Sequence, residues 1–188
     1  MKKSMEEYKI ELENNVKNVE KSYASLESHE LLPEDLKKQI DELNKKAKNV
    51  FAFFVNVASK GIQREQVLDK VKEEAYYLRK EFGGFFIATL KELPLNQQEN
   101  TCFFRNIDDL NITILEKESN ILNRSLENKL SDDVYLLFID WKADIEDTID
   151  CFENVYSEMK KQEYEISQFE KEKFELEIRH LEKKSSIL

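Results

Sequence analysis

Glycine and proline are scarce in this sequence, which has three glycines and two prolines among 188 residues. Tight turns depend on these two residue types, so their scarcity excludes a fold with many turns. Charged residues make up 36% of the chain, and Glu, Lys, Leu and Asn are abundant, a composition typical of long helices and coiled coils. We therefore predict an all-α fold in one domain, residues 1–188.

The chain also lacks a long apolar run and an excess of basic charge. Its longest apolar segments, residues 50–58 and 82–90, are far shorter than the ~20 residues that a transmembrane helix needs. The formal net charge is -10, so no general attraction to nucleic acid or anionic lipid is expected. The first residues lack the apolar segment of a secretory signal peptide. These features indicate a soluble, acidic, cytoplasmic protein.

Histidine and cysteine, which build many catalytic and metal sites, occur only twice each. Glu177 and His180 have the Glu-x-x-His spacing of di-iron bundles, but such sites need a second motif of the same kind. A helical hairpin would place Cys102 and Cys151 about 10 Å apart along its axis, which favours free thiols. No phosphate, zinc or calcium loop is present. We expect no catalytic, metal or cofactor site, and hence no enzyme.

Apolar residues recur at steps of three and four along most of the chain, and this spacing predicts helices. We expect them at residues 3–28, 33–59, 63–92, from 96–101 to 129, and 132–184. Pro33 is suited to begin the second helix, and Gly61 is suited to end it. The last helix would be roughly 80 Å long, about twice the length of the others.

Short loops between these helices predict an elongated antiparallel bundle. Residues 33–157 would form a four-helix head. Residues 1–29 would point away from it and pair with residues 158–185 as an antiparallel two-helix coiled-coil stalk, since both segments carry a seam of similar length. In the alternative arrangement, the first helix folds back to give a five-helix bundle, and the C-terminal residues are frayed or form a dimer contact.

Two aromatic-rich runs, residues 50–55 and 134–141, contain more apolar side chains than one seam per helix can bury. In the predicted head, both runs lie at the end away from the stalk. Packing of the second helix between its neighbours would bury most of them; otherwise the excess forms an exposed patch that marks a partner-binding surface. The predicted partner-binding residues are Phe51, Phe53, Tyr135, Leu136, Ile139 and Trp141.

Gly83 and Gly84 lie side by side in an otherwise helical pattern. Because glycine costs a helix about 1 kcal/mol relative to alanine, the pair indicates a close helix contact, a hinge or a membrane-inserting segment. The predicted bundle places both glycines beside Pro33, where the head meets the stalk. We therefore interpret Gly83, Gly84 and Pro33 as a structural joint or hinge.

Two functional hypotheses follow. The first is a non-enzymatic helical protein–protein interaction protein, such as an adaptor, assembly factor, inhibitor or immunity-type protein. It would bind another protein, or a second copy of itself as a homodimer, through the apolar and aromatic patch. The alternative is an α-helical pore-forming or membrane-remodelling protein that rearranges from a soluble bundle on contact with lipid. The long helices and the two apolar runs motivate that alternative.

Overall fold

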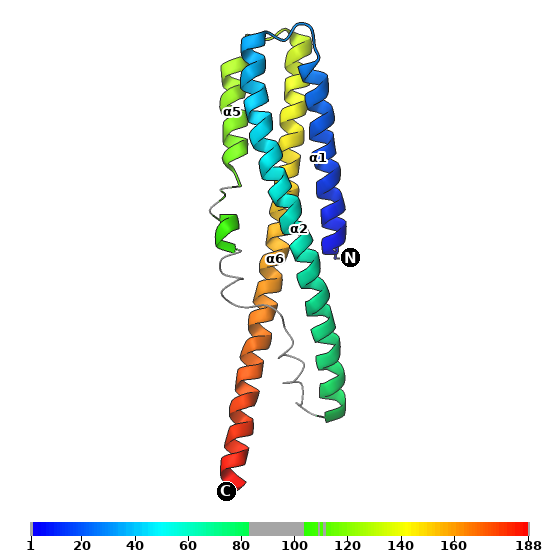
Figure 1. Ribbon diagram of the computed structural model, residues 1–188, viewed down its shortest axis with the longest axis vertical. Coiled ribbons are helices and arrows are strands. Elements are labelled where there is room, and N and C mark those ends of the chain that lie inside the picture. The colour runs from blue at the N-terminus through cyan, green and yellow to red at the C-terminus, as the bar shows by residue number, and fades with distance from the viewer. Residues whose placement is uncertain (1, 83–103, 109, 111, 188) are drawn as a thin grey trace.

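The computed structural model describes residues 2–82, 104–108, 110 and 112–187 (Figure 1). Throughout this part of the chain, all regular structure is helical and no strand occurs, which confirms the all-α prediction. The helices are α1 (Met5–Glu27), α2 (Glu34–Phe82), α5 (Ile114–Leu126) and α6 (Asp132–Ile187), with a helical turn at residues 104–108. The α1–α2 and α5–α6 loops meet at one end, which we call the upper end (Figure 1).

The narrow apolar seam predicted for the first helix is its buried stripe. Met5, Leu12, Val19 and Leu26, each seven residues from the next, are all buried. At the start of α1, Ser4 and Glu7 form a capping box: the Glu7 N–H donates to Ser4 Oγ, and the Ser4 N–H donates to Glu7 Oε2. This cap satisfies backbone donors that the first turn of a helix leaves free.

The predicted break at Gly61 is wrong, because α2 continues through it as a helix of 49 residues. Gly61 is buried where α1 and α6 pack against α2, and a Cβ there would overlap Met5 Cε and approach Met159 Sδ to 3.3 Å. The glycine is thus explained by close packing, and the helical backbone needs no turn there. The expected hairpin between residues 33–59 and 63–92 does not form.

As a consequence, α2 and α6 run side by side in the same direction (Figure 1). The Trp141 Nε1–H donates to Asn44 Oδ1 at 3.3 Å, and Arg64 pairs with Glu163 at 2.6 Å, so contacting residues are 97 to 99 positions apart. Between these two levels, Phe54 and Phe152 stack with their ring centroids 3.8 Å apart. The up-down order predicted for residues 33–157 required the opposite direction.

The packing of the first helix against the last is confirmed, but the predicted register is not. Tyr23 lies 6.2 Å from Trp141 between ring centroids, and the Gly61 contacts bring Met5 to the level of Met159. Residues 1–29 therefore follow the upper part of α6 instead of residues 158–185. This is the folded-back arrangement, and it arises because the short α1–α2 loop reverses the chain at the upper end, so that α1 packs beside the upper halves of α2 and α6.

The upper part of the molecule thus contains α1, α5 and the first halves of α2 and α6. Its core includes the apolar seam of α6, which is buried from Phe138 to Met159. The predicted helix ending at residue 129 is shorter than expected, since α5 covers Ile114–Leu126. Below the start of α1, α2 and α6 continue in the same direction and separate toward their lower ends (Figure 1).

Candidate functional site

The predicted partner-binding residues do not form one patch. Phe51 and Trp141 are buried in the core, and Trp141 also contacts Phe138 and Tyr23. Phe53, Tyr135 and Ile139 are half-buried against that core. Leu136, with 63% of its surface exposed, is the one predicted residue in solvent.

The parallel direction of α2 and α6 also separates the two aromatic runs. Because Phe54 stacks on Phe152, Phe53 lies near the level of Cys151. Tyr135 lies near the start of α6, where its hydroxyl donates to Asn123 Oδ1 at 2.9 Å. At 1.5 Å per residue, the axial separation between Phe53 and Tyr135 is about 24 Å. The core-packing interpretation therefore accounts for most of the aromatic excess.

Of the three predicted joint residues, Gly83 and Gly84 lie outside the described residues. Pro33 is exposed and directly precedes α2, where its carbonyl accepts from the Lys37 N–H at 2.9 Å. Glu34 and Asp35 follow it in the first turn of α2, as expected from the helix dipole. Pro33 thus begins α2 at the upper end and is remote from the second half of α6.

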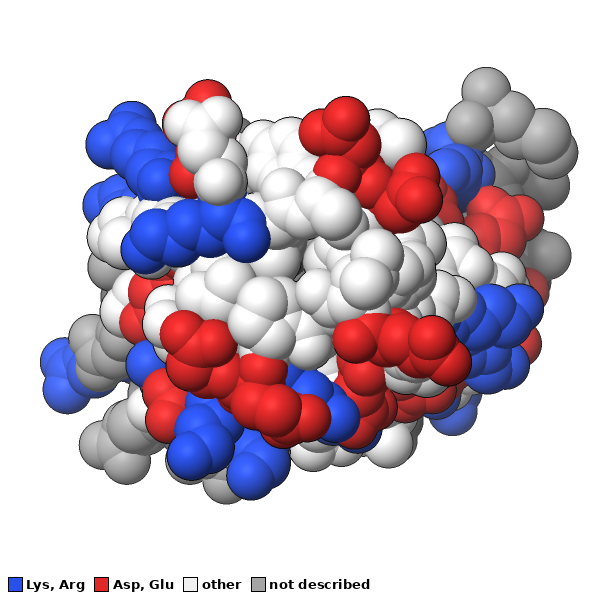
Figure 2. Space-filling model, turned by 90° about the horizontal axis from the view of Figure 1, so that it is seen from above, with Lys and Arg blue, Asp and Glu red and all other residues white. Residues whose placement is uncertain are grey.

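An uncharged surface does occur at the upper end, in a different place from the predicted patch. Figure 2 views this end and shows a centre without charged side chains, surrounded by acidic and basic ones. Leu31 of the α1–α2 loop is 60% exposed, and Leu136 near the start of α6 is 63% exposed. We call the two loops of this end, with the exposed Leu31 and Leu136 and the half-buried Leu130 of the α5–α6 loop, the upper end surface.

The charged residues of the loops and helix ends at this surface are almost all acidic. Seven carboxylates and one lysine are exposed between residues 27 and 35 and between 127 and 133: Glu27, Glu30, Glu34, Asp35, Glu127, Asp132, Asp133 and Lys129. An apolar centre with a charged rim is the usual anatomy of a protein–protein interface. The acidic rim here is complementary to a partner with a basic rim.

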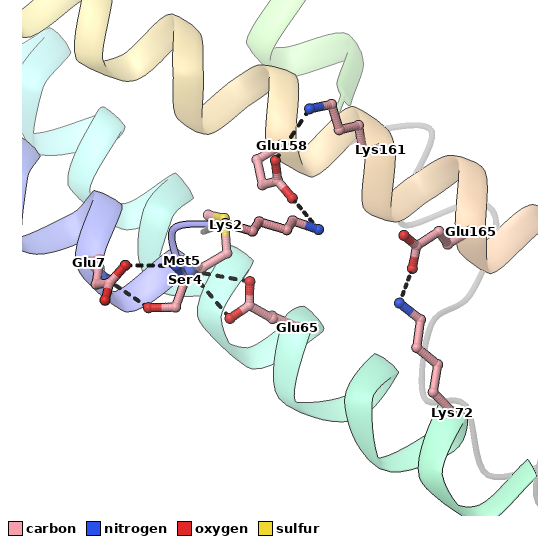
Figure 3. Close-up of polar contacts among 9 residues, drawn as sticks. All are labelled: Lys2, Ser4, Met5, Glu7, Glu65, Lys72, Glu158, Lys161 and Glu165. Atoms are coloured by element: carbon pink, nitrogen blue, oxygen red, sulfur yellow. Dashed lines mark hydrogen bonds and ion pairs between the residues drawn. The ribbon is translucent and has the colours of Figure 1, made fainter. Parts of the chain in front are cut away.

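A second site lies where α1 begins, between α2 and α6 (Figure 3). The Met5 N–H donates to both Oε atoms of Glu65 on α2, each at 3.2 Å. Lys2 pairs with the buried Glu158 of α6 at 2.8 Å, and this hydrogen bond raises the pKa of Lys2. Burial raises the pKa of the Glu65 carboxyl. Carboxylates of α2 and α6 thus fix the N-terminal end of α1 in the groove between them.

Beyond this point the groove between α2 and α6 continues without α1. A cavity of about 200 Å³ contains Lys2, Leu68 and Gln162 in its lining, and a second of about 490 Å³ contains Phe169. Both are also lined by Lys72 and Glu165, which form an ion pair across the two helices (Figure 3). We call these two adjoining cavities the lower groove.

Gln162 is the buried polar residue in this groove. Only 4% of its surface is exposed, and neither its Nε2 nor its Oε1 has a hydrogen-bond partner in the described chain. A buried amide without partners costs about 1–3 kcal/mol. The sequence contained one sign of this site, because Gln162 is a polar residue within the apolar seam of α6. The seam alone gave no reason to expect a groove.

Below the groove, α6 carries apolar side chains that face solvent. Phe174, Ile178 and Leu181 are 62%, 40% and 64% exposed. Their spacing of four and three residues places them on one face of the helix. We call residues 166–187 the α6 arm and these three residues its apolar stripe.

The remaining chemistry is limited. Among the residues that the structure describes, no group of three or more His, Cys, Asp or Glu side chains could hold a metal ion. Cys151 is free and buried, and burial raises the pKa of its thiol to about 11, so it is a poor nucleophile at neutral pH. Cys102 lies outside the described residues.

Two apolar runs, residues 50–58 and 82–90, motivated the membrane hypothesis. Phe51, Phe54, Val57 and Ala58 of the first run are buried in the core. Residues 83–90 of the second run lie outside the described part of the chain. Within that part, no helix combines the length and apolar character that crossing a bilayer requires.

The comparisons with known proteins give no match: no family model, no curated protein and no solved structure matches this chain.

Proposed function

We propose that this chain is a cytoplasmic, non-enzymatic helical interaction protein that binds another protein through the upper end surface. The observation that carries the proposal is the exposure of Leu31 and Leu136 near the two loops of the upper end, among seven exposed carboxylates and one lysine. The partner surface would be apolar at its centre and basic at its edge. Such a partner would remove both leucines from water and pair with the acidic rim.

The position of the surface supports this proposal. Interaction sites are commonly formed by loops that a rigid scaffold positions, and the α1–α2 and α5–α6 loops sit on a well-packed helical core. The left-handed backbone of Asn128, with φ of 68°, shapes the turn between α5 and α6. The hydrogen bond between Tyr135 and Asn123 then ties α6 to α5 directly below that turn.

Site-specific photo-crosslinking in the native cells tests the proposal. A photoreactive residue in place of the exposed Lys129 should give a discrete adduct whose second component mass spectrometry identifies. The same probe in place of Asn120, exposed on α5, should not give that adduct. Absence of any adduct at position 129, or equal labelling at both positions, would refute the assignment.

Two substitutions sharpen this test. Leu31→Lys with Leu136→Lys should abolish the adduct, because lysine at the centre opposes both burial and a basic partner. Ile121→Lys is the matched control, since Ile121 is 65% exposed on α5, and it should leave the adduct unchanged.

A further inference from the structure

The lower groove is a direct continuation of the groove that α1 fills. Above it, α1 lies between α2 and α6, runs opposite to both, and buries one apolar residue in every seven. Below Lys2, α2 and α6 keep their pairing, as the Lys72–Glu165 ion pair shows. The floor remains apolar there, since Leu68 and Ile166 are buried. An occupant of this groove should therefore resemble α1: an antiparallel helix with a narrow apolar stripe.

We propose that the occupant is the α6 arm of a second copy of this chain. Two copies related by a two-fold axis across their arms would each insert an arm into the lower groove of the other. The inserted arm would run opposite to α2 and α6, as α1 does. Its apolar stripe of Phe174, Ile178 and Leu181 would then leave solvent. Such an interface is isologous and closed, so association stops at the dimer.

The charge pattern of the arm favours antiparallel self-association. Residues 165–172 contain three glutamates and one lysine, which gives a formal charge of -2. Residues 178–185 contain one arginine, two lysines and one glutamate, which gives +2 with His180 neutral. An antiparallel pair centred near residue 175 places residues 178–185 of each copy beside residues 165–172 of the other, whereas a parallel pair places like charges together.

The lengths agree with this arrangement. Among the described residues, the lower groove begins at the level of Gln162, and its α2 wall ends at Phe82. Since Lys72 lies beside Glu165, Phe82 is about level with residue 175 of α6, so the two-walled part spans about 20 Å at 1.5 Å per residue. Residues 175–187 of a partner arm have about this length and fill it when the two-fold axis passes near residue 175. The incoming helix would end beside Gln162 and supply polar backbone groups to its unpartnered amide.

Light scattering coupled to size-exclusion chromatography gives the first test on the full chain. The expected mass is about 45 kDa, twice the chain mass of 22.4 kDa. Phe174→Ser with Leu181→Ser should give a monomer whose helical circular dichroism is unchanged. Ile10→Ser with Ile121→Ser removes two exposed apolar side chains outside the arm and should leave the dimer intact. A monomeric wild-type chain, or a dimer that survives the arm substitutions, would overturn the proposal.

Spin-label distances between the two copies then distinguish the directions of pairing. A label at the exposed Glu175, near the two-fold axis, should give a short distance. A label at the exposed Ser185 should give an axial separation of about 30 Å, because each label lies ten residues from the axis. Short distances at both positions would mean parallel arms and would contradict the arrangement.

Discussion

Replacement of Gly61 by alanine tests how closely α1 packs into the groove. Gly61 lies within α2, and a Cβ at this position would overlap Met5 Cε and lie 3.3 Å from Met159 Sδ. Met5 Cε is the far end of a flexible side chain, so it can move aside. Met5 is also fully buried, so this movement disturbs a packed contact.

The two opposing effects can be estimated. Alanine is favoured over glycine in a helix interior by about 1 kcal/mol. Crowding of a packed core costs about 1 kcal/mol or more, so Gly61→Ala alone should change the free energy of unfolding little. In a Met5→Ala background the overlap with Met5 is gone and only the 3.3 Å contact with Met159 Sδ remains, so the new methyl group adds up to about 0.8 kcal/mol by filling the vacated space. The gain should then approach 2 kcal/mol, which gives a coupling of about 1–2 kcal/mol between positions 5 and 61.

Urea denaturation of the four proteins of this cycle, followed by circular dichroism, measures the coupling. Ala52→Gly is the matched control, because Ala52 is exposed on α2; it should cost about 1 kcal/mol in both backgrounds. Equal gains from Gly61→Ala with and without Met5 would show that the two residues do not touch. A loss in both backgrounds would indicate that Gly61 ends a helix in the left-handed conformation.

Three further predictions concern buried polar groups. Burial raises the pKa of Glu65 above 4.5, so the contribution of its neutral carboxyl to stability is full below pH 4.5 and is lost as the pH rises through the raised pKa. The free energy of unfolding of Glu65→Gln relative to wild type should therefore increase across that pH range. Urea denaturation at a series of pH values measures it. Gln162→Leu should raise the free energy of unfolding by about 1–3 kcal/mol in the monomeric Phe174→Ser, Leu181→Ser chain, because it removes an unpartnered amide. The third prediction uses a chain in which Cys102 is replaced by serine, so that Cys151 is its one thiol. Because the pKa of the Cys151 thiol is raised to about 11, this thiol should react slowly with iodoacetamide at neutral pH and much faster in urea. Fast labelling of the folded chain would contradict its burial.

Much of the secondary structure could be predicted from periodicity alone. The heptad seam of α1 is buried as expected, and α6 extends from Asp132 to Ile187, close to the predicted 132–184. Ser131 directly precedes α6, and its carbonyl accepts from the Tyr135 N–H at 2.9 Å. These features depend on local spacing and on which face is apolar, which a sequence displays directly.

The error at Gly61 shows what periodicity cannot provide. Glycine ends helices, but it also allows close approach between helices, and the choice depends on residues distant in sequence. Here those residues are Met5 and Met159, which lie against Gly61 from two other helices. A turn at Gly61 makes α2 and α6 antiparallel, and it therefore places the two aromatic runs at one level. The predicted patch thus combines residues that the fold separates.

The unequal lengths of the helices explain why the two proposed binding surfaces lie apart. A 23-residue α1 of about 35 Å covers only half of a groove formed by a 49-residue α2 of about 73 Å and the longer α6. The uncovered half is the lower groove, and the upper end surface lies at the opposite end of the molecule. Dimerisation through the arms would therefore leave both upper end surfaces free, at the two far ends of the dimer. If both proposals hold, the partner binds with two-to-two stoichiometry, and the arm-disrupted monomer binds it one to one with the same intrinsic affinity. The wild-type dimer should then bind more tightly only where the partner is clustered, since a gain from bivalency requires both ends to be engaged together.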